Sequence, residues 1–468
     1  MPPFYRKARV PAGAAVLACR RMRIALPDLL ATRKGRLTAF FLLYVTEGIP
    51  LGFTAIAIAA QMRRQGLGPA AIGAFVGSLY LPWAFKWAVG PFVDTFSSQR
   101  FGRRRTWIFL MQIGMVATLF VAMGIDFVDQ IALFTAVIFL HNAFAATMDV
   151  AIDALAVNVL PEDERGSANG FMFAGASVGQ VVGGSGVLFL INVMPFATTY
   201  FFVAAAILAI TVFVVLPLRE KAMTAAEAEI HAARNIADEL KRFVREAWTA
   251  FTGSRAALVG VVAALLPAGA YALSLALQSN LAVELGLDDN AIAQLNFVSL
   301  LIYAPFCILG GWLSDRFGRR RTLALFVFLT GVPTVWLAWT MWQSGWIMPI
   351  DIKAANRPHP STLLLYTFWA TVIIYNVFQG LYYGIRTALY MDITTPAVAA
   401  TQFTAYMAML NLCISYTSWW QGLAVERIGY PMTLLVDAVV GLFGLLLLPL
   451  MRPPRTATTA PNAQPAAA

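Results

Sequence analysis

The chain has 468 residues, of which 59% are hydrophobic and 12% charged, and its formal net charge is +10. An ordinary soluble domain has roughly 45–50% apolar and about 25% charged residues. The composition therefore excludes a soluble globular protein and indicates an integral membrane protein. The three cysteines are scattered without metal-ligand spacing, so no disulfide framework, metal site or other cofactor is expected.

Apolar segments long enough to cross a membrane recur along the whole chain. A hydrocarbon core about 30 Å thick takes about 20 helical residues. The segments of this length are 38–61, 70–93, 106–124, 130–159, 168–193, 198–217, 256–283, 291–314, 322–342, 362–395, 402–424 and 431–450. We therefore expect an all-α integral membrane fold with twelve transmembrane helices.

The basic residues predict how these helices are oriented. Lys and Arg in short loops stay on the cytoplasmic side. Nearly all of those outside the predicted helices fall in alternate segments, and the outer loops hold only Arg63, Arg64, Lys353, Arg357 and Arg427. Both termini are therefore expected to be cytoplasmic. The Arg clusters are expected to contact anionic lipid at the inner face, and no nucleic-acid partner is expected.

The first two predicted helices each carry a charge at mid-membrane depth. Glu47 lies in "TEGIP", where Gly48 and Pro50 are expected to weaken or kink the helix. Broken helices at this depth are tolerated only against protein or a wet cavity, and they often mark transporter sites. Lys86 lies in the second helix. A charge near the bilayer centre costs at least about 2.5 kcal/mol, so both residues are functional candidates.

The fourth predicted helix contains "LHNAFAATMDVAIDALAVN", with two carboxyls four residues apart. Asp149 and Asp153 therefore lie one above the other on one helix face. Adjacent carboxylates in a poorly hydrated site resist ionising together, so one of them is expected to hold a proton that it can release. We predict proton coupling by Glu47, Asp149 and Asp153, although a bracing contact with Lys86 or with the Arg-rich loop explains Asp153 equally well. His141 is a candidate solute-binding residue, or a hydrogen-bonded structural one.

Two features precede the middle of the chain. Gly175, Gly179 and Gly183 have the four-residue spacing that suits close packing of the fifth predicted helix against another. Residues 219–254 form a charged connector whose apolar residues recur at helical spacing. We expect an amphipathic helix along the inner membrane face, although a solvated linker helix suits its N-terminal end equally well.

A repeated loop divides the chain into two halves. "GPFVDTFSSQRFGRRR" follows the second predicted helix and "GGWLSDRFGRRR" follows the eighth, with Asp94 and Asp315 221 residues apart. Each copy follows the second helix of a six-helix set, which indicates an internal repeat. The expected domains are a basic cytoplasmic tail (1–36), an N-terminal six-helix bundle (37–218), the amphipathic connector (219–254), a C-terminal six-helix bundle (255–451) and a disordered cytoplasmic tail (452–468).

The tenth predicted helix carries a second intramembrane cation. "YYGIRTALYMD" places Tyr382, Tyr383 and Arg386 on roughly one helix face. A guanidinium beside aromatic rings suits an anionic, sugar-like or ring-bearing solute. Ordinary packing explains the two tyrosines at least as well.

Five charged residues are expected at a common depth. At 1.5 Å of rise per helical residue, they lie roughly 12–18 Å from the inner membrane boundary. They are Glu47, Lys86, Asp149, Asp153 and Arg386. Paired across a central cavity, two cations and three carboxyls would lower the cost of burying each other. We predict that the two cations anchor the solute, and Asp437 in the twelfth helix is a further candidate without an evident partner.

Both repeated loops resemble the signature loop of the major facilitator superfamily, an aspartate followed by Gly-Arg-Arg-Arg. In that family these residues form a cytoplasmic latch that stabilises the outward-facing state. The resemblance implies a latch made of Asp94, Arg103 and Arg104 in the first half and of Asp315, Arg316, Arg319 and Arg320 in the second. The first copy departs from the family pattern, because "TFSSQR" lengthens it and Thr95 replaces a basic residue. The alternative is that the arginines only enforce the topology.

A closer resemblance covers most of residues 38–218 and part of 362–450. "EGIPLGF", "LPWAFKWAVGPFVD", "FGRRRTWI" and "TMDVAIDALAVNVLPEDERGSANG" resemble the AmpG-type muropeptide permeases and their relatives, the acetyl-CoA transporters and the RhtX/FptX-type siderophore permeases. The resemblance implies a proton-coupled importer in the bacterial inner membrane that works by alternating access. Anhydro-muropeptide or another peptidoglycan fragment is the lead substrate, and a siderophore is the alternative. We expect a monomer whose partners are the small solute, protons and lipid.

Two other classes of protein are less well supported. A membrane solute sensor that does not transport would need a signalling module, and the short tails offer none. A membrane-embedded acyltransferase would need a catalytic His at an accessible face, and only His141 lies in a predicted helix. We therefore do not expect an enzyme.

Overall fold

The computed structural model describes residues 28–95, 101–161, 164–220, 236–394 and 399–451, and every regular element in these ranges is a helix. The N-terminal half contains α1 (Arg33–Gly52), η2 (Phe53–Ile58), α2 (Ala59–Arg64), α3 (Pro69–Ala84), α4 (Lys86–Thr95), α5 (Arg103–Met123), α6 (Ile131–Val159), α7 (Arg165–Val181), η4 (Val182–Gly186), α8 (Val187–Leu190), α9 (Phe196–Ile210) and η5 (Thr211–Val215). The C-terminal half contains α12 (Arg255–Leu265), α13 (Ala276–Glu284), α14 (Asp289–Phe317), α15 (Arg319–Gln343), α16 (Thr362–Asp392), α17 (Ala399–Val440) and η7 (Phe443–Leu450). The connector forms α11 (Ile236–Thr252). Most of the two predicted tails lies outside the described residues.

Nine helices of the described residues are long and apolar enough to cross a membrane, or ten if the bent pair α11–α12 is one span. Three places account for the difference from the twelve predicted segments. The second segment is interrupted at Phe85, between α3 and α4. Residues 402–450 contain two predicted segments, which are separated by a kink at Gly429, where φ is +78°. The third place is the seventh segment.

The seventh predicted segment, 256–283, is not one continuous helix, and this corrects the expectation from its hydropathy. α12 ends at Leu265 and α13 begins at Ala276, so 266–275 is unwound. Pro267 has no backbone N–H to donate, and Gly269 takes a φ of +88°, which favours glycine. Hydropathy alone misses the break because the unwound residues are themselves apolar.

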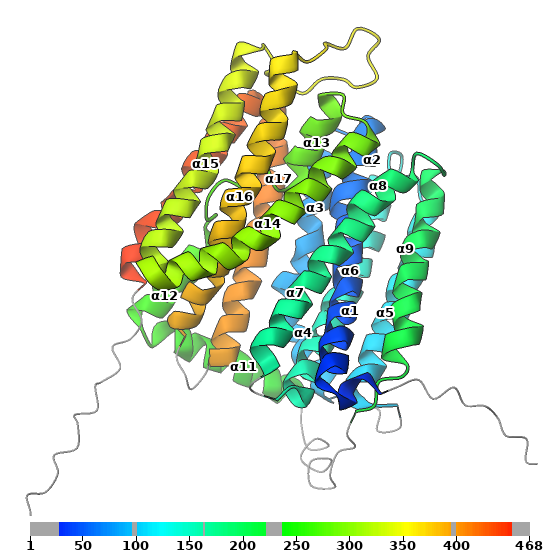
Figure 1. The fold of residues 1–468 in the computed structure, drawn as a ribbon, viewed down its shortest axis with the longest axis vertical. Coiled ribbons are helices and arrows are strands. Elements are labelled where there is room, and N and C mark those ends of the chain that lie inside the picture. The colour runs from blue at the N-terminus through cyan, green and yellow to red at the C-terminus, as the bar shows by residue number, and fades with distance from the viewer. Residues whose placement is uncertain (1–27, 96–100, 162–163, 221–235, 395–398, 452–468) are drawn as a thin grey trace, which may run out of the picture.

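The two halves stand side by side and touch through a few helices. In Figure 1 the N-terminal half, blue to teal, lies mainly on the right and the C-terminal half, green to red, on the left. α3 packs against α17, α2 packs against α13, and α14 reaches across to α8 (Figure 1). α11 runs beneath both halves, bent by 108° from α12, and contacts both α4 and α17. The connector therefore joins the halves at one end of the bundle.

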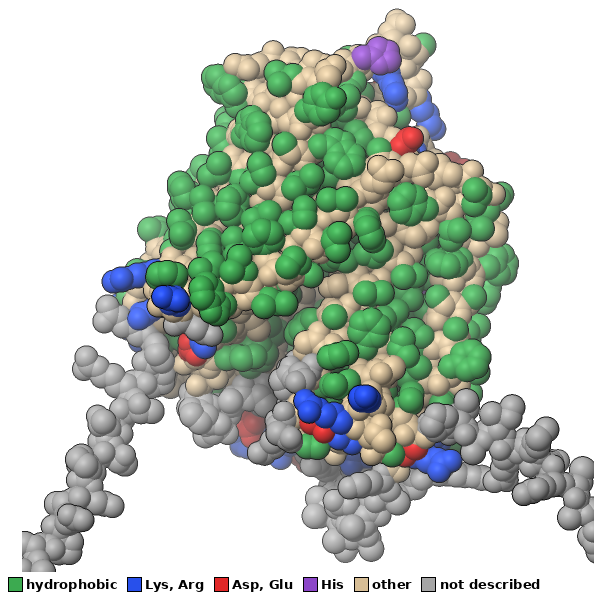
Figure 2. Space-filling model, in the orientation of Figure 1, with side chains coloured by type: hydrophobic (Ala, Val, Ile, Leu, Met, Phe, Trp, Pro, Cys, Tyr) green, Lys and Arg blue, Asp and Glu red, His purple; other side chains and the backbone are tan. Residues whose placement is uncertain are grey.

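The surface of the bundle is apolar over its middle and charged at its two ends. Figure 2 shows hydrophobic side chains spread over the face of the helices, with Lys, Arg, Asp, Glu and His gathered above and below them. Large side chains such as Leu301, Ile308 and Phe213 are 66–77% exposed. Because lipid solvates such side chains and water does not, this band fits the hydrocarbon region of a membrane.

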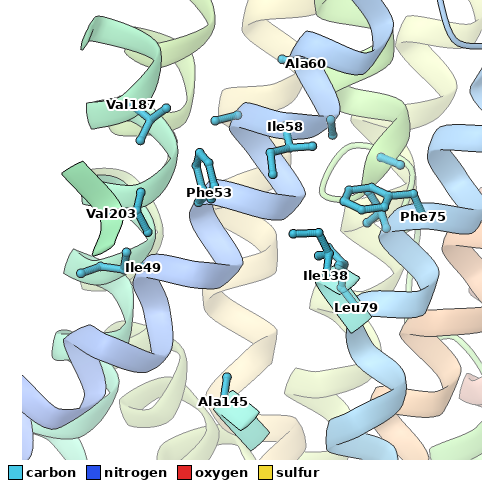
Figure 3. Close-up of a cluster of buried hydrophobic side chains, with 14 of the residues drawn as sticks. Ile49, Phe53, Ile58, Ala60, Phe75, Leu79, Ile138, Ala145, Val187 and Val203 are labelled. Atoms are coloured by element: carbon cyan, nitrogen blue, oxygen red, sulfur yellow. The ribbon is translucent and has the colours of Figure 1, made fainter. Parts of the chain in front are cut away.

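Glycines let α1 and α7 approach each other closely within the N-terminal half. A Cβ added at Gly48 would lie 2.0 Å from the Ala176 carbonyl oxygen, and one at Gly179 would lie 2.3 Å from that of Val45. The close packing predicted from the glycine spacing of the fifth helix is confirmed. Figure 3 shows buried side chains in the core of this half, among them Phe53.

Candidate functional site

In the N-terminal half, Lys86 and two carboxyls form a partly buried ionic cluster. Lys86 begins α4, directly after the interruption at Phe85, while Asp149 and Asp153 lie one turn apart on α6. Lys86 Nζ is 3.0 Å from Asp149 Oδ2 and 3.6 Å from Asp153 Oδ2. The side chain of Asp149 is 4% exposed and that of Asp153 is 45% exposed. The predicted brace between Asp153 and Lys86 is present, and Lys86 also holds Asp149.

α1 supplies a third carboxyl and a phenol to this cluster. The Tyr44 hydroxyl donates a hydrogen bond of 2.6 Å to Asp153 Oδ1. Glu47, one turn further along α1, interacts electrostatically with Asp149 and Lys86 and forms a hydrogen bond with Trp83. Its Oε2 atom is buried without a hydrogen-bond partner in the described part of the chain. The π-helical turn η2 begins three residues after Pro50, so the helix distortion predicted near "TEGIP" takes this form. Such turns occur frequently at functional sites.

The N-terminal cluster has more carboxyls than cations. Glu47, Asp149 and Asp153 face only Lys86 among the charged residues that the described ranges bring there. If all three carboxyls were ionised, the cluster would carry an excess of two negative charges. Burial makes such an excess costly, and binding a proton removes part of it. Lys86 is engaged by its two carboxylates in this structure.

In the C-terminal half, Arg386 is a buried cation with aromatic neighbours. It lies on α16 with 5% of its surface exposed. Its Cζ atom is 5.6 Å from the ring centre of Tyr382 and 5.4 Å from that of Tyr383, so the shared helix face predicted for these residues is present. Arg386 Nη1 donates a hydrogen bond of 2.7 Å to the Tyr271 hydroxyl. Tyr303 adds an edge-to-face contact with Tyr383, with ring centres 6.0 Å apart.

Arg386 has no acidic partner among the described residues. No carboxylate of those ranges lies within ion-pair distance of it, and its Nε atom is buried without a hydrogen-bond partner. The predicted pairing of all five charged residues across one cavity is therefore wrong for this cation. The structure divides them into an acidic cluster around Lys86 and a phenolic cluster around Arg386, which we call the N-cluster and the C-cluster.

Tyr271 is a member of the C-cluster that the sequence did not indicate. It lies in the unwound stretch 266–275, which hydropathy predicted as ordinary helix. Asp437 also has a definite partner here, because its Oδ2 accepts hydrogen bonds from the backbone N–H groups of Tyr271 and Ala272. The combination of Pro267 and Gly269 within an apolar segment was the available signal for this break.

His141 lies apart from both clusters. It is fully buried, and its Nδ1 is 3.0 Å from both Thr118 Oγ1 and the Met115 carbonyl oxygen of α5. These contacts fit the structural alternative weighed from the sequence. A role of His141 in solute binding remains a prediction.

The arginine loop of the N-terminal half is held by a residue from the connector. The side chain of Asp94 lies outside the described part of the structure. Glu220 accepts hydrogen bonds from the backbone N–H groups of Arg104, at 3.0 Å, and Arg105, at 2.5 Å, so it caps the first turn of α5. The Arg104 guanidinium donates a hydrogen bond of 2.9 Å to the Val93 carbonyl oxygen on α4. Arg103 is the first residue of α5.

The second arginine loop pairs with the end of α16. The side chain of Asp315 lies outside the described part of the structure. Arg319 forms an ion pair with Asp392, and Arg316 stacks over Trp312 with 5.8 Å to the ring centre. Arg320 follows in the first turn of α15. The latch therefore remains a prediction, and Asp392 is a partner that the sequence did not indicate.

At the opposite end of the bundle, one buried and one partly exposed ion pair join the two halves. Arg63 of α2 pairs with Glu284 of α13, and the same guanidinium donates a hydrogen bond of 2.8 Å to the Ile350 carbonyl oxygen. Tyr430 donates a hydrogen bond of 2.6 Å to Glu284. Arg64 lies 3.0 Å from Asp289 of α14. The sequence placed Arg63 and Arg64 only as rare basic residues of an outer loop, yet they connect the halves.

Comparison with known proteins agrees with this architecture. The family model of the Major Facilitator Superfamily matches residues 37–350 and 259–467. The anhydromuropeptide permease of Escherichia coli K12 is 25% identical over 418 residues, which cover 88% of this chain and 79% of that protein. A putative transporter AmpG 1 of Rickettsia prowazekii is 24% identical over 143 residues, 30% of this chain and 32% of that protein.

Solved structures of other transporters share the fold at low sequence identity. The nucleoside transporter NupG superposes with a TM-score of 0.64 at 13% identity, covering 89% of this chain and 98% of that one. The xylose transporter XylE from E. coli, in an inward open conformation, gives a TM-score of 0.62 at 13% identity, covering 89% and 95%. The chain is an integral membrane protein and belongs to the Major Facilitator Superfamily, as a secondary transporter similar to AmpG.

Proposed function

We propose that the protein imports anhydro-muropeptides, or other peptidoglycan fragments, across the bacterial inner membrane and that protons drive the import. One observation carries the proposal: among the described residues the two halves hold opposite unbalanced charges, with excess carboxyls in the N-cluster and a cation without a carboxylate partner in the C-cluster. The similarity to the anhydromuropeptide permease of E. coli supports the solute class. We also propose that both termini lie in the cytoplasm, which the distribution of Lys and Arg supports.

The N-cluster is proposed to carry the protons. Within the described ranges, Glu47 has one buried oxygen without a hydrogen-bond partner, which supports a role as a carboxyl that accepts a proton. Asp149 is held against Lys86 and is 4% exposed, so opening of the cluster would change its surroundings most. Asp153 is 45% exposed, so we propose that water reaches Lys86 and Asp149 from its side of the cluster. Lys86 then acts as the counter-ion that the carboxyls share.

The C-cluster is proposed to bind the solute. A buried guanidinium without a carboxylate partner attracts an anionic group, and Arg can bind a carboxylate through two parallel hydrogen bonds. The rings of Tyr382, Tyr383 and Tyr303 lie beside it, and aromatic faces pack well on sugar rings. Peptidoglycan fragments carry both carboxylates and sugars.

The ends of the bundle are proposed to open in turn. Arg63 and Glu284 join the halves at the end that the charge distribution places outside. These contacts must break when that end opens to receive the solute. The latch residues of the two arginine loops lie at the other end, where α11 also contacts both halves. We propose that the protein works in this way as a monomer.

Uptake by the purified protein in proteoliposomes tests the function. An inward proton gradient is imposed, and a labelled anhydro-muropeptide, a ferric siderophore and acetyl-CoA are compared. We expect accumulation of the muropeptide alone, and collapse of the accumulation when a protonophore is added. Accumulation of the siderophore instead would replace the solute, and accumulation that persists without a gradient would refute proton coupling.

A further inference from the structure

Asp437 is a buried carboxyl on α17 that contacts the unwound stretch of the seventh segment. It is 1% exposed. Its Oδ2 atom accepts hydrogen bonds from the backbone N–H groups of Tyr271, at 2.8 Å, and Ala272, at 2.9 Å. Its Oδ1 atom accepts a hydrogen bond of 2.7 Å from Gln421 Nε2. No Lys or Arg among the described residues forms an ion pair with it.

The unwound stretch needs such partners because its backbone groups have left the helix. An unsatisfied N–H or C=O in an apolar surrounding costs several kcal/mol. Beside Asp437, Thr330 Oγ1 accepts a hydrogen bond of 3.1 Å from the Ala270 N–H, and the Tyr375 hydroxyl donates one of 2.7 Å to the Ala270 carbonyl. Asp437 satisfies two successive N–H groups with one carboxylate oxygen, so it holds the backbone at Tyr271 directly.

The same residue, Tyr271, connects this anchor to Arg386. Its N–H donates a hydrogen bond to Asp437, and its hydroxyl accepts the 2.7 Å hydrogen bond from Arg386 Nη1. Within the described ranges the guanidinium forms no other hydrogen bond, so the position of the Tyr271 hydroxyl determines the orientation of the cation. A shift of the unwound backbone therefore moves the guanidinium.

We propose that Asp437 is a positioning residue for solute binding, and that Tyr271 is part of the solute site. Asp437 fixes the backbone at Tyr271 and Ala272, and Tyr271 then directs the Arg386 guanidinium toward the anionic group of the solute. The proposal rests on the proposed function of the C-cluster. Asp437 does not carry the transported proton, because both of its oxygens are occupied in holding the protein itself.

Two measurements on the purified protein test this. Amide hydrogen exchange, which needs no solute, compares the parent with Asp437→Asn and with Tyr271→Phe. Asp437→Asn should speed the exchange of the Tyr271 and Ala272 amides, since a neutral amide oxygen accepts their two hydrogen bonds more weakly than the carboxylate oxygen does, whereas Tyr271→Phe should leave the exchange near the parent rate. Unchanged exchange in Asp437→Asn would overturn the anchor.

Uptake kinetics then test the positioning. Asp437→Asn and Tyr271→Phe should each raise KM for the anionic solute about tenfold, while the pH profile of uptake keeps its shape. Gln421→Met removes the hydrogen bond from Gln421 to Asp437 Oδ1 and should raise KM less. This variant replaces Asp437→Asn in the test if Asp437→Asn does not fold. The control Thr334→Val, a buried hydroxyl that bonds only its own helix, should leave KM unchanged.

The decisive comparison is between the anionic solute and an uncharged analogue whose carboxyls are amidated. The parent should bind the anionic solute more tightly than the analogue, and Asp437→Asn and Tyr271→Phe should each lose most of this difference in affinity. A lower maximal rate with an unchanged KM, or a shifted pH profile in Asp437→Asn, would refute the positioning role. If the parent transports none of the tested solutes, the proposed function fails, while the exchange experiment still decides whether Asp437 holds the segment.

Discussion

Lys86, which is 18% exposed, and Arg386, which is 5% exposed, are cations of the two halves, and their surroundings differ completely. Lys86 lies between two carboxylates, with a third carboxyl nearby on α1. Arg386 lies among phenols and aromatic faces, with no carboxylate in range among the described residues. A cation that is already compensated is a poor receptor for an anion, whereas an uncompensated one gains strongly from binding it. We therefore propose that the two halves, which share a repeated loop, divide the binding of protons and of solute between them.

The clusters also differ in what holds them. The N-cluster is built on regular helices with two small distortions, the interruption at Phe85 and the π-helical turn after Pro50. The C-cluster depends on the unwound stretch 266–275, which is fixed by hydrogen bonds to side chains of α15, α16 and α17. If protons bind in one half and the solute in the other, coupling them requires that a movement of one half shifts the other. Contacts between the halves, such as that of α3 with α17, could transmit this movement.

Replacing Arg386 should give the largest effect and would remove the difference between the clusters. Arg386→Ala is expected to weaken solute binding by roughly thirtyfold or more, because a buried charge partner of the solute is lost. Arg386→Lys should retain part of the affinity, since the charge remains but the paired hydrogen bonds do not. Equilibrium binding of the labelled solute measures this. An unchanged affinity in Arg386→Ala would place the solute elsewhere.

Removing a proton carrier should separate coupling from binding. Glu47→Gln and Asp149→Asn are each expected to abolish accumulation driven by a pH gradient and to leave exchange of solute across the membrane largely intact. The side chain stays similar in size, but it can no longer gain and lose a proton. Asp153→Asn, which alters the more exposed carboxyl, should have the smaller effect. If either of the first two variants accumulated solute like the parent, its assignment as a carrier would fall.

Lys86 tests whether the N-terminal cation serves the carboxyls rather than the solute. Lys86→Met leaves Asp149 and Asp153 without their shared partner and should destabilise the protein by about 3 kcal/mol. Combining it with Asp149→Asn should restore part of that loss, which thermal unfolding in detergent measures. Solute affinity, measured in parallel, should change far less than in Arg386→Ala. If Lys86→Met lost as much solute affinity as Arg386→Ala, Lys86 would bind the solute, as the sequence predicted.

The smallest effect is expected at a peripheral ion pair of the N-terminal half. Arg36 hydrogen-bonds Glu164 at 2.6 and 2.9 Å and holds the pKa of that carboxyl below its ordinary value of 4.5. The stabilisation of the folded state by this ion pair is therefore fully present above pH 4.5, and it is lost as the pH falls through the lowered pKa of Glu164. Glu164→Gln should lower the melting temperature slightly at neutral pH, and the difference should vanish in acid. A difference that grew in acid would contradict the assignment.

The sequence predicted the fold and half of the site because these depend on local patterns. Hydropathy located the apolar segments, and the four-residue spacing of Asp149 and Asp153 placed both on one face toward Lys86. Glycine spacing predicted the close contact of α7 with α1. Each of these is a property of a single helix.

The remainder depends on contacts between distant segments, which no local pattern contains. Tyr271 reaches Arg386 only because the seventh segment unwinds, and Asp437 contacts it from 166 residues away along the chain. Glu284 meets Arg63 across the two halves, 221 residues apart. Depth along a helix placed five charges at one level, but it could not tell which of them face each other. For that reason the expected single cluster proved to be two.

Proton movement that accompanies solute uptake tests the division of labour most directly. Proteoliposomes with an internal pH indicator would receive the solute without an imposed gradient, using the parent, Glu47→Gln and Arg386→Lys. The parent should acidify the interior as solute enters. Glu47→Gln should bind solute with near-parent affinity and move no protons, while Arg386→Lys should need more solute but acidify the interior by the same amount per solute. Proton movement that persists in Glu47→Gln, or protons lost per solute in Arg386→Lys, would contradict the account.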